Sequence, residues 1–146
     1  MDELILKLIA AFGATLCFSV LFSVDKRQLI FCGLTGSTAL LIYTGLSALT
    51  TEAAAVLATS FVIALLSRKL AIVRRSPVTV FLMPGIIPLA PGADLYNTMY
   101  AAVTGNSDAV SSYGYEALAV AGAVAIGIAL AFSLPNKLFA PKFHKK

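Results

Sequence analysis

Long apolar runs alternate with short polar stretches along the chain. A helix that crosses a bilayer needs about 20 mostly apolar residues, and five segments have suitable length and composition. The pattern therefore predicts an all-α integral membrane protein that forms a single transmembrane domain over residues 1–146. We expect about five transmembrane helices, at residues 4–24, 29–49, 53–70, 78–104 and 116–134.

The connections between these segments are short and polar. Residues 25–28 form a charged turn, and Thr51 with Glu52 resembles the cap and first turn of a helix. Residues 105–114 are predicted to be the clearest water-exposed loop. The first residues are acidic where a signal peptide would be basic, so we expect segment 4–24 to be a retained helix.

The composition supports a location in lipid. Of the 146 residues, 59% are hydrophobic and only 12% are charged, whereas soluble domains carry about 25% charged residues. In a soluble protein, the net charge of +4 would suggest a nucleic-acid partner. Here the basic residues fall in short clusters between apolar runs, which indicates membrane topology and no nucleic-acid partner.

The positions of lysine and arginine predict how the chain crosses the membrane. Residues 25–28 contain two of them, residues 67–77 four and residues 135–146 four, while the connections at 50–52 and 104–115 contain none. With five spans, ten of the eleven basic residues lie on one face, which the positive-inside tendency places in the cytoplasm. We therefore expect the N-terminus outside and the C-terminus inside.

The fourth segment is interrupted by a PGxxPxxPG motif at residues 84–92. Three of the six prolines and two of the ten glycines fall in this motif, so it cannot continue one straight helix. Irregular backbone at membrane depth is tolerated only where protein or a water-filled cavity satisfies its polar groups, and transporters tend to bind cargo there. The motif predicts either a functional break or a short loop between two half-buried elements. A functional break would place a substrate path at Pro84, Gly85, Pro88, Pro91, Gly92, Asp94 and Tyr96.

Asp94 is the one acidic residue in the interior of a predicted span, since Glu116 stands at the first position of the fifth. Its carboxylate could carry a proton, hold a substrate ammonium group, or cap the half-helix that begins near Ala93. The free amides after Gly92 form the positive end of that half-helix, where a substrate carboxylate could dock. Tyr96, about one turn further on, could contribute a hydroxyl or a ring face.

No catalytic constellation is visible in the sequence, and we expect neither enzyme activity nor a cofactor or metal. The single histidine, His144, lies near the end of the basic tail. Cys17 and Cys32 lie inside apolar runs without metal-ligand spacing and are interpreted as small packing residues.

Small residues one turn apart form a stripe on the fifth predicted span. In lipid, helices associate by close packing, which favours such stripes at contact surfaces. We therefore predict helix packing through Ala117, Ala121, Ala125 and Ala129.

A resemblance to a known family rests on two neighbouring segments, PGIIPLAPG at residues 84–92 and LYNTMY at residues 95–100. Together with the hydrophobic layout of nearly the whole chain, they resemble the membrane-embedded C-terminal half of the threonine/serine exporter family. In the split form of that family, the small subunit is a separate chain of about this length. The chain departs from the family at Asp94, a position that is commonly small and uncharged, which favours the capping role or a lineage-specific one.

The resemblance implies the small subunit of a two-component secondary transporter in the bacterial inner (plasma) membrane. Its expected activity is efflux of threonine, serine or a similar small metabolite, driven by the proton-motive force, beside a larger membrane subunit. Two alternatives stay open: a non-transporting scaffold for that partner, and a homo-oligomeric channel. The cargo, the coupling ion and the stoichiometry are not specified by the sequence.

Overall fold

The computed structural model describes residues 2–135, which are almost entirely helical. The basic tail and His144 lie outside the described residues. The elements in chain order are α1 (Asp2–Leu21), α2 (Leu29–Ser47), α3 (Glu52–Arg74), α4 (Thr79–Ile86), the 3₁₀ helix η1 (Ile87–Leu89), α5 (Gly92–Val103) and α6 (Ser107–Ser133).

Four of these helices, α1, α2, α3 and α6, are each long and apolar enough to cross a membrane. The segments Thr79–Leu89 and Gly92–Val103 qualify only together, and they are bent by 53° at the break between them. The described chain thus contains four to five potential spans. The prediction of an all-α membrane protein is confirmed.

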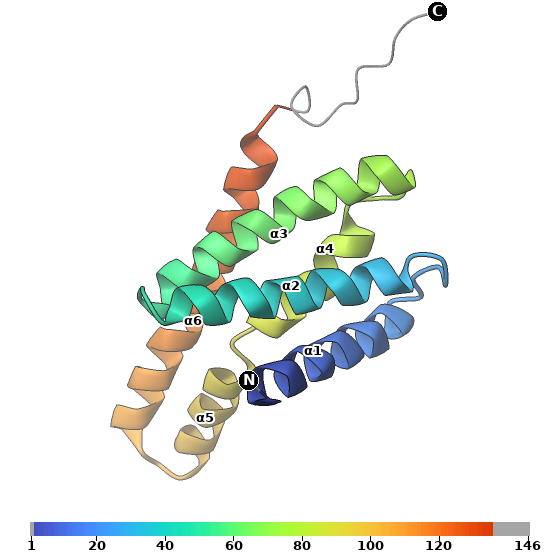
Figure 1. Ribbon diagram of the computed structural model, residues 1–146. Coiled ribbons are helices and arrows are strands. Elements are labelled where there is room, and N and C mark those ends of the chain that lie inside the picture. The colour runs from blue at the N-terminus through green and yellow to red at the C-terminus, as the bar shows by residue number, and fades with distance from the viewer. Residues whose placement is uncertain (1, 136–146) are drawn as a thin grey trace, which may run out of the picture.

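Helix α2 lies at the centre of the bundle and packs against α1, α3 and α4 (Figure 1). Helix α6 packs along α3, and its first half forms a hairpin with α5 that projects from the rest of the bundle (Figure 1). Helices that follow one another along the chain are joined by short connections, as is usual for helical bundles.

The start of α6 differs from the prediction of a water-exposed loop at residues 105–114. The loop is shorter, because Asn106 caps a helix that begins at Ser107 instead of near residue 116: its side chain accepts a hydrogen bond from the Ala109 amide at 3.2 Å. Asp108 in the first turn complements the positive helix end. Most residues of this polar stretch are exposed, and its backbone is helical from Ser107.

The contact between α6 and α3 is made by a different face from the predicted one. Of the predicted stripe, Ala117 is buried within the chain, whereas Ala121, Ala125 and Ala129 are exposed. The buried face carries Ala117, Val120, Ala123, Gly127 and Ala131.

Gly127 is the physical reason for this choice of face. A Cβ atom at Gly127 would lie 2.0 Å from the Ser60 Oγ and 2.7 Å from the Leu57 carbonyl oxygen. Only a glycine permits this approach of the two helix backbones, as is common where helices pack in lipid.

The break in the fourth span is held by hydrogen bonds from α2. Pro84 lies inside α4 and has no N–H, so the Val80 carbonyl loses its donor within the helix. The Cys32 Sγ donates to this carbonyl oxygen at 3.2 Å, and the Thr35 Oγ1 lies 3.5 Å from the next carbonyl oxygen, that of Phe81. Cys32 is buried as predicted for a packing residue, but it also satisfies backbone that a proline has released.

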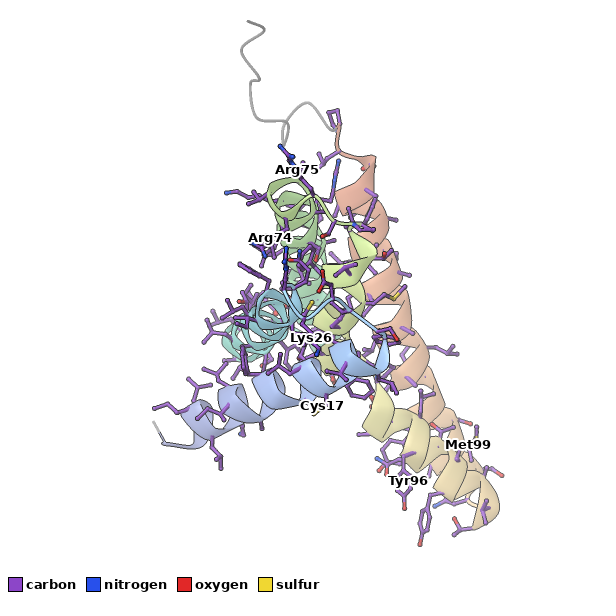
Figure 2. All side chains as sticks on the ribbon, turned by 90° about the vertical axis from the view of Figure 1, so that its right-hand side faces the viewer. Cys17, Lys26, Arg74, Arg75, Tyr96 and Met99 are labelled. Atoms are coloured by element: carbon purple, nitrogen blue, oxygen red, sulfur yellow. The ribbon has the colours of Figure 1, made fainter. Side chains whose placement is uncertain are left out.

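At the end of the bundle where α3 ends, two arginines donate hydrogen bonds to neighbouring parts of the chain. Arg74 donates from Nε to the Gln28 Oε1 at 3.0 Å and from a terminal nitrogen to the Arg27 carbonyl at 3.1 Å. Buried Arg68 donates to the Ala131 and Leu134 carbonyls at the end of α6, where a cation is favoured by the helix dipole. The basic clusters of the α1–α2 and α3–α4 connections therefore lie at one end of the molecule, where Figure 2 shows Arg74 and Arg75.

Candidate functional site

A pocket of about 160 Å³ lies at the break between η1 and α5. Four parts of the chain meet there: the last turns of α2, the start of α3, the connection into α5, and the middle of α6. The lining residues are Tyr43, Glu52, Val56, Pro88, Leu89, Ala90, Pro91, Gly92, Ala93, Asp94 and Val120.

The polar groups of this pocket are carboxylates at the N-termini of two helices. Glu52 stands in the first turn of α3 and Asp94 in the first turn of α5. The Tyr43 hydroxyl donates to the Glu52 Oε1 at 3.2 Å. Two acids and a phenol thus face one small volume, which suits a cationic group.

Asp94 does not cap α5 with its side chain. Its carboxylate accepts no hydrogen bond from the described residues, and the nearby Thr98 hydroxyl donates at 2.6 Å to the Asp94 backbone carbonyl instead. The residue is half-buried and lines the pocket. The capping role thus gains no support from the geometry, whereas a carboxylate that lines a pocket suits the binding of a cation.

The start of α5 supplies donors beside these acids. The Gly92 amide donates to the Ala90 carbonyl at 2.7 Å, and the Leu95 amide donates to the Pro91 carbonyl at 3.0 Å. The amides of Ala93 and Asp94 donate to no described residue. They are the donors left over at any helix start, and they favour an anion.

Four of the seven predicted path residues come together at this pocket: Pro88, Pro91, Gly92 and Asp94. Pro84 and Gly85 are buried in α4, and Pro84 lines a separate pocket of about 260 Å³ beside the α1–α2 connection. Tyr96 is 69% exposed and stacks on Tyr100, with ring centroids 6.4 Å apart. These three residues are not part of the pocket at the break.

Sequence reasoning missed Tyr43 and Glu52 as pocket residues. Glu52 was recognised only as a helix start, and Tyr43 lies in a span without a neighbouring motif. Their shared signal is position: both lie next to the α2–α3 connection, which has no basic residue. Spacing along the chain does not show that Asp94 lies at the level of this connection, because that depends on where the broken span ends.

These features define a multi-pass membrane protein with a polar pocket at a bent helix pair. Residues 7–134 match the family described as "Threonine/Serine exporter, ThrE". Because this match covers most of the 146 residues, the chain belongs to that family. No curated protein and no solved structure matches the chain.

Family membership points to an exporter-type transporter for a small molecule and away from an enzyme. Within residues 2–135, no group of three or more His, Cys, Asp or Glu side chains could hold a metal ion. The polar groups that line the pocket are two carboxylates, a phenol and backbone amides.

Proposed function

We propose that this chain is the small subunit of a two-component secondary transporter that exports threonine, serine or a similar small metabolite. The observation that carries the proposal is the pocket at the break, where two carboxylates and a helix start face one volume. We place it in the bacterial inner membrane, with its N-terminus outside and its C-terminus in the cytoplasm, because the basic residues of the α1–α2 and α3–α4 connections lie together.

An amino acid has complementary groups for both parts of this pocket. Its ammonium group would bind between Asp94 and Glu52, with the Tyr43 hydroxyl holding Glu52 in place. Its carboxylate would accept from the Ala93 and Asp94 amides at the start of α5. Broken helices of transporters bind substrates in this way, with half-helix N-termini pointing at anionic groups.

Proton coupling would use the same acids. Protonation of Asp94 would weaken its hold on the ammonium group. Binding of a proton and binding of substrate would then compete at one residue.

The larger subunit would cover apolar surface that this chain leaves open. On α6, the outward-facing residues Ala121, Ala125 and Ala129 form a small-residue stripe beside exposed Leu118 and Ile126. In a membrane, such a stripe suits close helix packing. The same observation favours a second candidate function, a scaffold that stabilises the larger subunit without lining its path.

Efflux of threonine and serine from dipeptide-loaded cells tests the proposal. The compared strains carry this chain, the larger subunit, both, or both with Asp94→Asn. The amide keeps the shape but loses the charge, so we expect at least about tenfold slower efflux, since a charge-assisted hydrogen bond contributes about 1.5–3 kcal/mol. Asp108→Asn is the matched control, because this first-turn acid lies outside the pocket.

Each result selects one function. Export that needs both chains and is lost only with Asp94→Asn, at unchanged membrane abundance, supports the proposal. Export by the larger subunit alone makes this chain a scaffold, and export by this chain alone makes it a homo-oligomeric channel or carrier. Equal efflux for the two asparagine variants would remove Asp94 from the path.

A further inference from the structure

Helix α5 presents an aromatic and apolar face that no other part of residues 2–135 covers. The residues of this face are all more than half exposed, and they follow helical spacing: Leu95, Tyr96, Met99, Tyr100 and Val103. The opposite face packs on α6 through buried Ala101 and through Thr98, whose methyl group would lie 3.7 Å from a Cβ at Gly114. The outward face is therefore the free side of an ordered hairpin.

This hairpin extends past the end of the bundle. Val120 of α6 packs in one cluster with Val56, which lies one turn into α3. The part of α6 before residue 117 thus runs beyond the start of α3 at Glu52, and α5 runs beside it (Figure 1). Figure 2 shows Tyr96 and Met99 on the hairpin, away from Arg74 and Arg75 at the basic end.

The length and direction of α5 argue against its crossing the hydrocarbon by itself. Its 12 residues extend for about 18 Å, compared with the roughly 30 Å thickness of the apolar layer. It is bent by 53° from the preceding segment, so it runs obliquely to that segment. α2 and α3 alone are already long enough to cross the apolar layer.

The exposed side chains of α5 differ in kind from those of a helix in hydrocarbon. Exposed large side chains of α1 are leucine, isoleucine, valine and phenylalanine. Four of the five tyrosines lie in α5 and the first part of α6, at positions 96, 100, 113 and 115. Tyrosine gathers where a bilayer meets water, because its ring is apolar and its hydroxyl is hydrated.

The distribution of charged residues also suits a position of the hairpin at the boundary between bilayer and water. Residues 76–136 contain no lysine or arginine, and the acids Asp94, Asp108 and Glu116 all avoid the outward face of α5. Two of them lie in first turns, Asp94 of α5 and Asp108 of α6. An apolar face with tyrosines and no charge, bordered by charged helix ends, suits the interface between acyl chains and headgroups.

We propose that α5 is an interfacial helix whose face of Leu95, Tyr96, Met99, Tyr100 and Val103 rests in the bilayer boundary at the end of the bundle opposite the basic clusters. The pocket at Gly92 and Asp94 then opens at the membrane surface instead of near the bilayer centre. This inference concerns membrane depth and does not depend on which molecule is exported.

Depth-dependent fluorescence quenching tests the inference on the full chain in lipid vesicles. The chain contains no tryptophan, so Tyr100→Trp introduces a single tryptophan by a conservative change on the exposed face. Ile9→Trp, on the exposed surface of α1, is the hydrocarbon control, and Asp108→Trp, at the tip of the hairpin, is the aqueous control. Vesicles contain lipids brominated at shallow or deep acyl positions, and iodide probes exposure to water.

We expect Tyr100→Trp to be quenched most strongly by shallow bromines, between the deep optimum of Ile9→Trp and the iodide-sensitive Asp108→Trp. Met99→Trp, also on the exposed face, repeats the measurement at a residue that is not aromatic. Strongest quenching by deep bromines would instead make α5 half of a span. Quenching by iodide alone would place the hairpin in water, and protection from all quenchers would indicate a second copy on this face; each of these results overturns the inference.

Discussion

The two halves of the broken span have opposite surroundings. In α4 and η1, the buried side chains include Phe81, Leu82, Pro84, Gly85 and Leu89, whereas in α5 only Ala101 is buried. The Val80 carbonyl released by Pro84 accepts from the Cys32 thiol of α2, while the amides at the start of α5 face a pocket.

This contrast shows two roles for irregular backbone: its polar groups are either satisfied by protein or left available to a ligand. Where the break lies inside the bundle, protein groups satisfy its polar atoms and the segment is fixed. Where it reaches the pocket, the same kind of unsatisfied group is available to a ligand. The expected effects of mutations follow from this difference and decrease from packing to hydrogen bonding to surface contacts.

The largest effect is expected at the glycines of the two halves. A Cβ at Gly85 would lie 3.1 Å from the Ile63 Cγ2 and 3.3 Å from the Thr35 Oγ1, whereas one at Gly92 meets nothing within 4 Å. Gly85→Leu should therefore lower the free energy of unfolding by about 3 kcal/mol through overpacking. Gly92→Leu should leave stability unchanged and abolish export by filling the pocket.

Thermal unfolding in detergent, followed by the fraction of monodisperse protein, measures the first effect, and efflux measures the second. If both leucine variants unfold at the same temperature, the two halves of the broken span do not differ in packing. Normal efflux with Gly92→Leu would argue against a substrate path at the break.

An intermediate effect is expected at Cys32. Cys32→Val removes the donor to the Val80 carbonyl, so we expect about 1 kcal/mol of destabilisation from an unsatisfied buried acceptor. Cys32→Ser keeps a donor in place and should unfold closer to the wild type. Cys17→Val is the matched control, because Cys17 is exposed. Equal stability of the valine and serine variants at Cys32 would show that this hydrogen bond does not hold α4.

The smallest effect is expected on the exposed face of α5. Tyr96→Ala removes a stacking contact with Tyr100, and such a contact contributes about 0.5 kcal/mol where the rings are largely exposed. Tyr115→Ala, at an exposed tyrosine of α6, should change stability even less. A loss for Tyr96→Ala as large as that for Gly85→Leu would mean that protein, and not lipid, covers this face.

Much of the fold followed from hydrophobic runs. The helices α1, α2 and α3 lie within about one turn of their predicted bounds, because a spanning helix satisfies its own backbone and needs only an apolar stretch. The start of α6 was predicted too late, because its first turns carry polar side chains on a helical backbone.

The site was predicted in part for a related reason. Proline and glycine mark a break wherever they occur, so Pro88, Pro91, Gly92 and Asp94 could be found from local sequence. Tyr43 and Glu52 reach the same pocket from α2 and α3, and no local pattern connects them to it.

By itself, the sequence determined that the chain is helical, that it belongs in a membrane, where its fourth segment breaks and which of its turns are basic. Each of these properties depends on residues that are neighbours in the chain. Only the tertiary structure decided that Gly127 selects the face of α6 against α3, that Cys32 satisfies Val80, and that Glu52 lies with Asp94. These depend on close approach between helices, which is set by packing of the whole bundle.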